Sequence, residues 1–124
     1  MSLKNDGGVL TVPVQINGAL TLDFVVDSGA ADVSIPADVV STLIRTGTLR
    51  QTDFIGERTY VLADGSKVPS QLFTIRSLQI GGHTIANVEG SIASANATPL
   101  LGQSFLRHFR SWKIDNARNV LVLE

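Results

Sequence analysis

An apolar hairpin that ends in an acidic turn is the feature that most constrains the fold of this chain. Residues 9 to 26 alternate apolar and other side chains on both sides of Asn17-Gly18. Alternation with a period of two is typical of a half-buried strand, and Asn-Gly is a strong hairpin signal. The second strand runs directly into Phe24-Val25-Val26-Asp27-Ser28-Gly29-Ala30, written FVVDSGA. The pattern predicts a β-hairpin whose second strand delivers one carboxylate to a tight turn.

Two interpretations compete for Asp27. Asp, Ser and Gly are ordinary residues of surface turns. However, Val25 makes the end of the strand apolar on both faces, so we expect that end to be buried and Asp27 to point inward. A lone buried carboxylate is costly, whereas two facing carboxylates can share one proton. The chain offers one acid in such a place, so the second acid is expected from another copy across a two-fold axis.

Composition limits the classes of partner. The 124 residues suit one domain, with 1–7 interpreted as a tail or expression remnant and 8–124 as the domain. A net charge of −1 argues against nucleic acid or an anionic membrane surface as a partner. No apolar run is long enough for membrane insertion, and no signal peptide stands at the start, which leaves the compartment open. Cysteine is absent and His83 and His108 are isolated, so we expect no metal site and no cofactor.

The remaining segments predict short strands and two short helices. We expect a strand over 32–35, a helix over 36–46, and a hairpin whose strands flank Ala63-Asp64-Gly65-Ser66. A short helix should follow Leu100-Leu101-Gly102, and residues 111–123 should form a closing hairpin. This pattern favours a small all-β barrel or sandwich.

The neighbours of Asp27 have interpretable roles. The Ser28 hydroxyl could brace the facing turn of a second copy, and Gly29 permits a tight turn and close backbone approach. Leu100-Leu101 would pack under the loop, and the Asp64-Gly65 tip is a candidate lid.

Together these elements resemble the retropepsin-type aspartic proteases, and more closely the single-lobe bacterial members of that clan. The resemblance rests on Asp27-Ser28-Gly29-Ala30, the glycine-tipped hairpin at Gly65, and Leu100-Leu101-Gly102 before a helix, and it spans roughly residues 8 to 123. It implies an all-β, small closed β-barrel of the retropepsin-like type with one or two short helices, a single lobe that dimerises.

The resemblance also implies an activity. A pair of Asp27 side chains, one from each subunit of a homodimer, would activate a water to hydrolyse a peptide bond without a covalent intermediate. The implied catalytic residues are Asp27, Ser28 and Gly29. An extended peptide would bind like an added strand, against Ala30, Ala31, Tyr60, Leu62, Ala63, Asp64 and Gly65, with Leu100, Leu101 and Gly102 as support.

Two positions depart from the family pattern. Retroviral members carry an acid two residues after the motif glycine and an arginine after the second glycine, where this chain has Ala31 and Gln103. We therefore expect the inner ion pair to be missing. The alternative functions are a catalytically silent dimerisation or peptide-binding module on the same fold, and a monomeric β-barrel binding domain.

Overall fold

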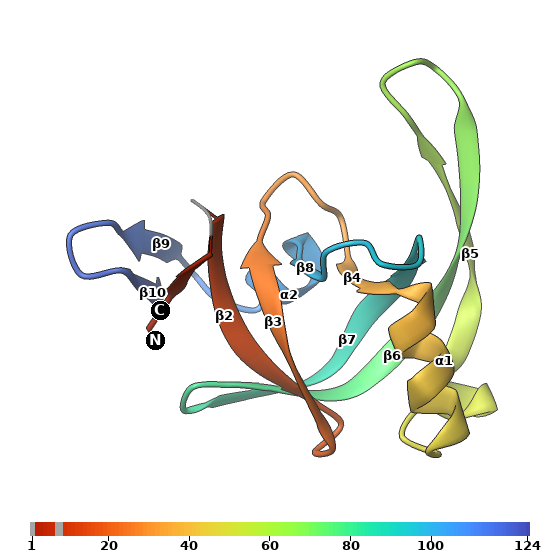
Figure 1. The fold of residues 1–124 in the computed structure, drawn as a ribbon, viewed down its shortest axis with the longest axis horizontal. Coiled ribbons are helices and arrows are strands. Elements are labelled where there is room, and N and C mark those ends of the chain that lie inside the picture. The colour runs from red at the N-terminus through yellow and green to blue at the C-terminus, as the bar shows by residue number, and fades with distance from the viewer. Residues whose placement is uncertain (1, 7–8) are drawn as a thin grey trace.

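Strands dominate the computed structural model, which describes residues 2–6 and 9–124 (Figure 1). The helices are α1 (Ala37–Arg45) and α2 (Gln103–Leu106), with a short 3-10 turn η1 at Gln51–Asp53. The strands are β1 (Lys4–Asp6), β2 (Val9–Ile16), β3 (Leu20–Val26), β4 (Val33–Pro36), β5 (Phe54–Val61), β6 (Lys67–Ile80), β7 (His83–Ala93), β8 (Leu100–Leu101), β9 (Trp112–Asp115) and β10 (Val120–Leu123). The expectation of a mainly β fold with two short helices is confirmed for the described part of the chain.

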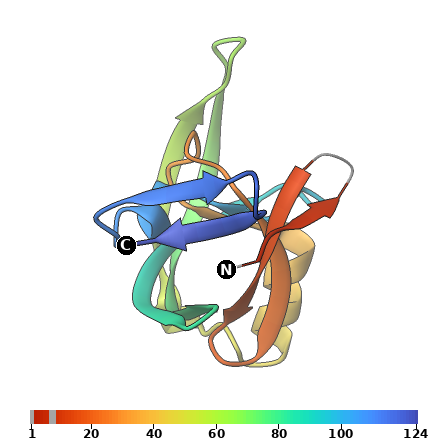
Figure 2. The same ribbon diagram turned by 90° about the vertical axis from the view of Figure 1, so that its left-hand side faces the viewer.

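The main sheet has the strand order β1-β2-β3-β8-β4-β7-β6-β5. Strand β2 also pairs with β6 through Gln15 opposite Gln79 and Ile16 opposite Leu78, so the sheet returns on itself as a ring. Two pairings are parallel: β3 with β8, and β4 with β7. A separate two-stranded sheet, β9 with β10, lies beside the N-terminal strands (Figure 2).

The core fills the inside of this ring. Its largest fully buried side chains include Phe24, Phe73 and Phe105, contributed by β3, β6 and α2. Helix α1 buries Val40 and Leu43, as its apolar stripe predicts, and Gly47 follows it with a φ of 73°. Pro36 ends β4 and caps the helix instead of occupying the expected first helical position, because its ψ of 146° is extended. A single core therefore anchors β3, β4, β8 and α2, the elements next to Asp27 and its loop.

The predicted hairpins form where Asn-Gly and Asp-Gly stand. Asn17 and Gly18 have φ values of 49° and 68°, and Gly65 has a φ of 86°. The β5–β6 hairpin extends well away from the rest of the molecule (Figure 1), and its tip at residues 62–66 is exposed. We call residues 62–66 the flap tip.

Part of the segment that we interpreted as a tail from the sequence, residues 4–6, forms a strand of the main sheet. Strand β1 pairs with β2 through Lys4 opposite Thr11, and the buried Leu3 donates a backbone hydrogen bond of 2.7 Å to Asn119. Residues 1, 7 and 8 of the expected tail boundary lie outside the described residues.

Candidate active site

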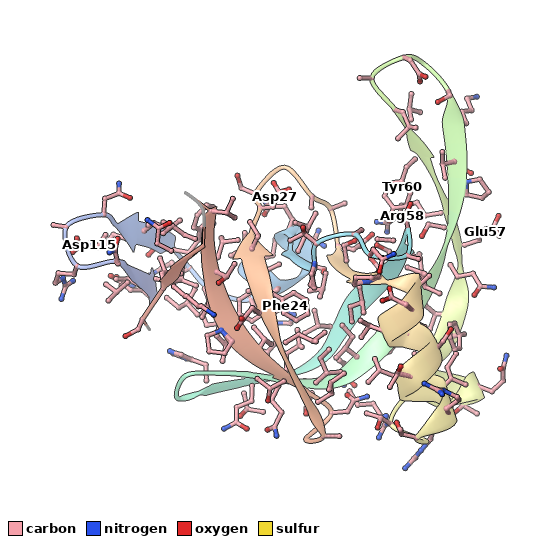
Figure 3. The ribbon with its side chains drawn as sticks, in the orientation of Figure 1. Phe24, Asp27, Glu57, Arg58, Tyr60 and Asp115 are labelled. Atoms are coloured by element: carbon pink, nitrogen blue, oxygen red, sulfur yellow. The ribbon has the colours of Figure 1, made fainter. Side chains whose placement is uncertain are left out.

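Asp27 lies directly after β3, where the parallel partner β8 fixes its backbone (Figure 3). The Asp27 N–H donates to the Leu101 carbonyl at 3.0 Å, and the Val25 N–H donates to the Pro99 carbonyl at 3.0 Å. Leu101 is fully buried, as expected of a residue that supports the loop. The sheet therefore sets the position of the acid before the turn begins.

The turn itself is held by the Asp27 side chain. Its Oδ1 accepts a hydrogen bond of 2.9 Å from the Gly29 N–H, and the Ala30 N–H donates to the Asp27 carbonyl at 3.2 Å. Asp27 is half-buried, whereas Ser28 and Gly29 are exposed. A β-carbon on Gly29 would lie 3.2 Å from Asp27 Oδ1, so any other residue at this position would crowd the carboxylate.

The expectation that the end of β3 is buried on both faces is wrong for the isolated chain. Val25 and Val26 are only half-buried, and Phe24 is the fully buried residue of this strand end. The physical reason is that Val26, although it packs against the core, lies where the chain leaves the sheet for the exposed turn at Ser28 and Gly29. Asp27 therefore sits at an open edge of the single chain.

The start of α2, in the C-terminal half of the chain, binds the loop after Asp27 through backbone hydrogen bonds. Gln103 and Ser104 donate backbone hydrogen bonds of 2.8 and 2.9 Å to the carbonyls of Ala30 and Ala31. A β-carbon at Gly102 would lie 2.2 Å from the Asp32 carbonyl oxygen, so only glycine permits this approach. The side-chain amide of Gln103 adds a bond of 2.8 Å to the Ser28 carbonyl.

A pocket of about 460 Å³ adjoins the loop. Of the residues predicted to form the site, it is lined by Gly29, Ala30, Ala31, Tyr60, Leu62 and Leu100. Its wall also includes the apolar side chains of Val68, Ile92 and Ala97. Asp27 and Ser28 lie next to this wall in the turn, Ala63, Asp64 and Gly65 form the flap tip beyond it, and Leu101 and Gly102 lie beneath the loop. The predicted residues thus gather around one loop and one hairpin.

Sequence reasoning missed a partly buried ionic cluster beside this pocket. Asp32, with 1% of its side chain exposed, accepts hydrogen bonds of 3.0 and 2.9 Å on its two oxygens from Arg58 Nη1. The Tyr60 hydroxyl donates to Asp32 Oδ2, and Arg58 Nη2 donates to Glu89 at 3.0 Å. We call Asp32, Arg58, Tyr60 and Glu89 the Asp32 cluster. Figure 3 shows Arg58 and Tyr60 on the inner side of β5 and Glu57 on its outer side.

The cluster shifts the titration of its members. Burial raises the pKa of the Tyr60 hydroxyl, and its hydrogen bond to Asp32 raises that pKa further. The pKa of Glu89 is raised mainly by a hydrogen bond with Asp32, then by burial and by the Asp32 charge. Burial lowers the pKa of Arg58, but the charges of Asp32 and Glu89 outweigh it and raise that pKa. The acids therefore stabilise the guanidinium, and Glu89 retains a proton more readily than an ordinary Glu.

Comparisons with known proteins identify the fold family. Residues 12–108 match the family model described as "gag-polyprotein putative aspartyl protease". The chain belongs to this aspartyl protease family. A solved structure, a retropepsin-like aspartic protease from Rickettsia conorii, is similar at a TM-score of 0.68 and 26% identity, over 90% of this chain and 88% of that one. No curated protein matches the sequence.

The retropepsin-like fold of this aspartyl protease family member agrees with the resemblance stated from the motifs. The match contains the Asp27 turn, the flap tip and Gly102 in one continuous region. At the two departing positions, Ala31 and Gln103, no ion pair forms, but Asp32 forms one with Arg58 from another strand. Arg58 and Tyr60 share one face of β5, but nothing in the sequence linked them to an acid 26 and 28 residues away.

Residues 2–6 and 9–124 contain no group of three or more His, Asp or Glu that could hold a metal ion. No helix in these described ranges is long and apolar enough to span a membrane.

Proposed function

We propose that the protein is a homodimeric aspartic endopeptidase whose catalytic pair consists of Asp27 from each of two subunits. The observation that carries the proposal is the placement of Asp27. Asp27 is half-buried at an open edge, fixed by β8 and by the Gly29 N–H, next to a pocket that the β5–β6 hairpin helps to line. The family match supports protease chemistry at this turn.

The pair would work by general acid–base catalysis. One Asp27 carboxylate takes a proton from a water as that water attacks the scissile carbonyl. The other Asp27, protonated, donates to the carbonyl oxygen, and the tetrahedral intermediate then collapses with proton transfer to the leaving amine. Two carboxylates that face each other cannot both ionise easily, so one of each kind is present at the same pH. The pair requires a second copy of the chain, because each chain places one acid in the turn.

The substrate would be a peptide in extended conformation. Its backbone would pair with the exposed edge of the loop at Gly29 and with the flap tip at Ala63, Asp64 and Gly65, as an added strand does. One side chain would enter the 460 Å³ pocket between Tyr60, Leu62 and Leu100. Because the flap tip is exposed and carries a glycine with a φ of 86°, it is able to adapt to a bound peptide.

Substitution of the acid tests the chemistry. Asp27→Asn keeps the side-chain oxygen that accepts from Gly29, so the fold should persist, but it removes the general base. Cleavage of a mixed peptide library between pH 4 and 7 should fall by about 10²–10⁴-fold. The matched control is Asp23→Asn, on the exposed face of the same strand, where the acid only approaches Lys4 at 3.8 Å. Full activity in the folded Asp27→Asn protein would end the proposal.

Mixing experiments test the shared pair. When wild type and Asp27→Asn are co-refolded in equal amounts, random pairing leaves about one quarter of dimers with both acids. Activity should therefore fall to about a quarter of the wild-type value, whereas independent sites would leave about half. A statine-type inhibitor, whose hydroxyl takes the place of the attacking water, should bind wild type and not Asp27→Asn.

The silent binding module is the alternative to test. It predicts a dimer that binds peptide through the same pocket without cleaving it. Sedimentation over a range of concentrations establishes whether a dimer forms, and a concentration-independent monomer would favour the monomeric binding domain instead.

A further inference from the structure

Strand β5 reaches the flap tip from an edge of the sheet. In the strand order it is terminal and pairs with β6 alone. The outer portion of the β5–β6 hairpin is open, since Val61 and Val68 are 69% and 43% exposed. A hairpin with so little buried apolar surface is free to bend unless another contact holds it.

Two side chains on one face of β5 provide such a contact. Arg58 and Tyr60 are separated by two positions, so they project to the same side of the strand. Both bind the Asp32 carboxylate, Arg58 with a single nitrogen to both oxygens and Tyr60 with its hydroxyl. Charge-assisted hydrogen bonds to a buried carboxylate are stronger than neutral ones.

Asp32 ends the loop that begins at Asp27, residues 27–32, which we call the Asp27 loop. It follows Ala31, whose carbonyl is bound by the Ser104 N–H, and it precedes Val33, whose N–H donates to the buried Ser104 hydroxyl at 3.0 Å. The same hydroxyl donates to the Glu89 carbonyl at 2.7 Å. The backbone on both sides of Asp32 is thus bound to Ser104 of α2, and through Ser104 to β7, while the Asp32 carboxylate is bound by β5.

We propose that the hydrogen bonds of Arg58 and Tyr60 to Asp32, which we call the tie, hold β5 and the flap tip in a fixed position relative to the Asp27 loop. Arg58 and Tyr60 are then positioning residues for the substrate. The inference rests on the proposed function for its catalytic consequence. Tyr60 also lines the pocket, so the same tie sets the shape of the pocket wall. Neither Arg58 nor Asp32 is assigned a step in the chemistry.

Conservative variants distinguish a role of Arg58 and Tyr60 in positioning the substrate from a role in folding alone. Tyr60→Phe keeps the ring in the pocket wall and removes only the hydroxyl bond to Asp32. Arg58→Lys keeps the positive charge that a buried carboxylate requires but loses the guanidinium contacts. Glu57→Gln, on the outer face of the same strand, removes a charge without touching the tie (Figure 3). Each protein is assayed for peptide cleavage and for amide hydrogen exchange over residues 54–68.

The expected signature is a change in KM and in local exchange. Loss of a hydrogen bond to a charged group should raise KM about tenfold in Tyr60→Phe and accelerate exchange in 54–68 by a similar factor. Arg58→Lys should show the same two changes, and Glu57→Gln should show neither. A purely structural role would instead reduce the amount of active enzyme, so that apparent kcat falls while KM and the exchange of 54–68 in the folded protein stay constant.

Measurement of both KM and hydrogen exchange over residues 54–68 distinguishes a failure of this inference from a failure of the proposed function. Unchanged exchange and unchanged KM in both tie variants would overturn the tie. If wild type cleaves no peptide, the proposed function fails, and exchange over 54–68 still decides whether Asp32 holds β5.

Discussion

The side-chain amide of Gln103 donates a hydrogen bond of 2.8 Å to the backbone carbonyl of Ser28. It links the start of α2 to the turn of Asp27 across 75 residues of sequence. Together with the backbone bond from Gln103 to Ala30, it holds both ends of the Ser28-Gly29 turn. A position that departs from the retroviral pattern therefore still supports the loop, through an amide in place of a guanidinium.

Removal of this amide should loosen the turn. In Gln103→Ala the lost bond is worth about 0.5–1.5 kcal/mol, so kcat/KM should fall by roughly 2- to 12-fold while the fold is kept. Gln103→Arg retains a donor at the same place and should keep most of the activity. Steady-state kinetics of the three proteins checks this, and equal kcat/KM in wild type and Gln103→Ala would show that the bond has no role in positioning.

Gly102 should tolerate no side chain. In Gly102→Ala the new β-carbon would lie 2.2 Å from the Asp32 carbonyl oxygen and 2.6 Å from that of Ala30. Because both atoms are backbone, the loop must shift, and we expect a loss of about 1–3 kcal/mol in the free energy of unfolding.

The control for Gly102→Ala is Gly82→Ala. A β-carbon there meets nothing within 4 Å, so the free energy of unfolding should change by less than about 0.5 kcal/mol. Urea unfolding of both variants measures the difference. Equal stability of the two would contradict the close approach of the 30–32 backbone to Gly102.

Glu89 should make stability depend on pH in a defined direction. Its folded-state pKa is raised, mainly by the hydrogen bond with Asp32, then by burial and the Asp32 charge. The native state then binds more protons than the unfolded state, so the contribution of Glu89 is fully present below about pH 4.3, the ordinary Glu value, and is lost as pH rises through the folded pKa.

Glu89→Gln removes this dependence. The difference in free energy of unfolding, variant minus wild type, should increase as the pH is raised from about 4 toward neutrality. Urea unfolding at several pH values gives the difference directly, and a flat or falling difference for Glu89→Gln would contradict the raised pKa.

The sequence by itself determined the local parts of this protein. Alternation around Asn17-Gly18 and Asp64-Gly65 set two hairpins, since turn chemistry and a period of two act over a few residues. The motif at Asp27 and the glycine at position 102 pointed to the aspartyl protease family, because each needs a particular residue for a particular backbone shape. These signals are readable because both their cause and their effect lie in one short stretch.

Only the tertiary structure decided what surrounds Asp27. The pairing of β8 with β3 brings Gln103 to Ser28, and the strand order β4-β7-β6-β5 brings Arg58 and Tyr60 to Asp32. Sequence alone also overstated the burial of the β3 end, because Val25 and Val26 are apolar but only half-buried, whereas Phe24 is fully buried. Burial and ionic pairing depend on which strands become neighbours, and that arrangement minimises the free energy of the whole chain and not of any one segment.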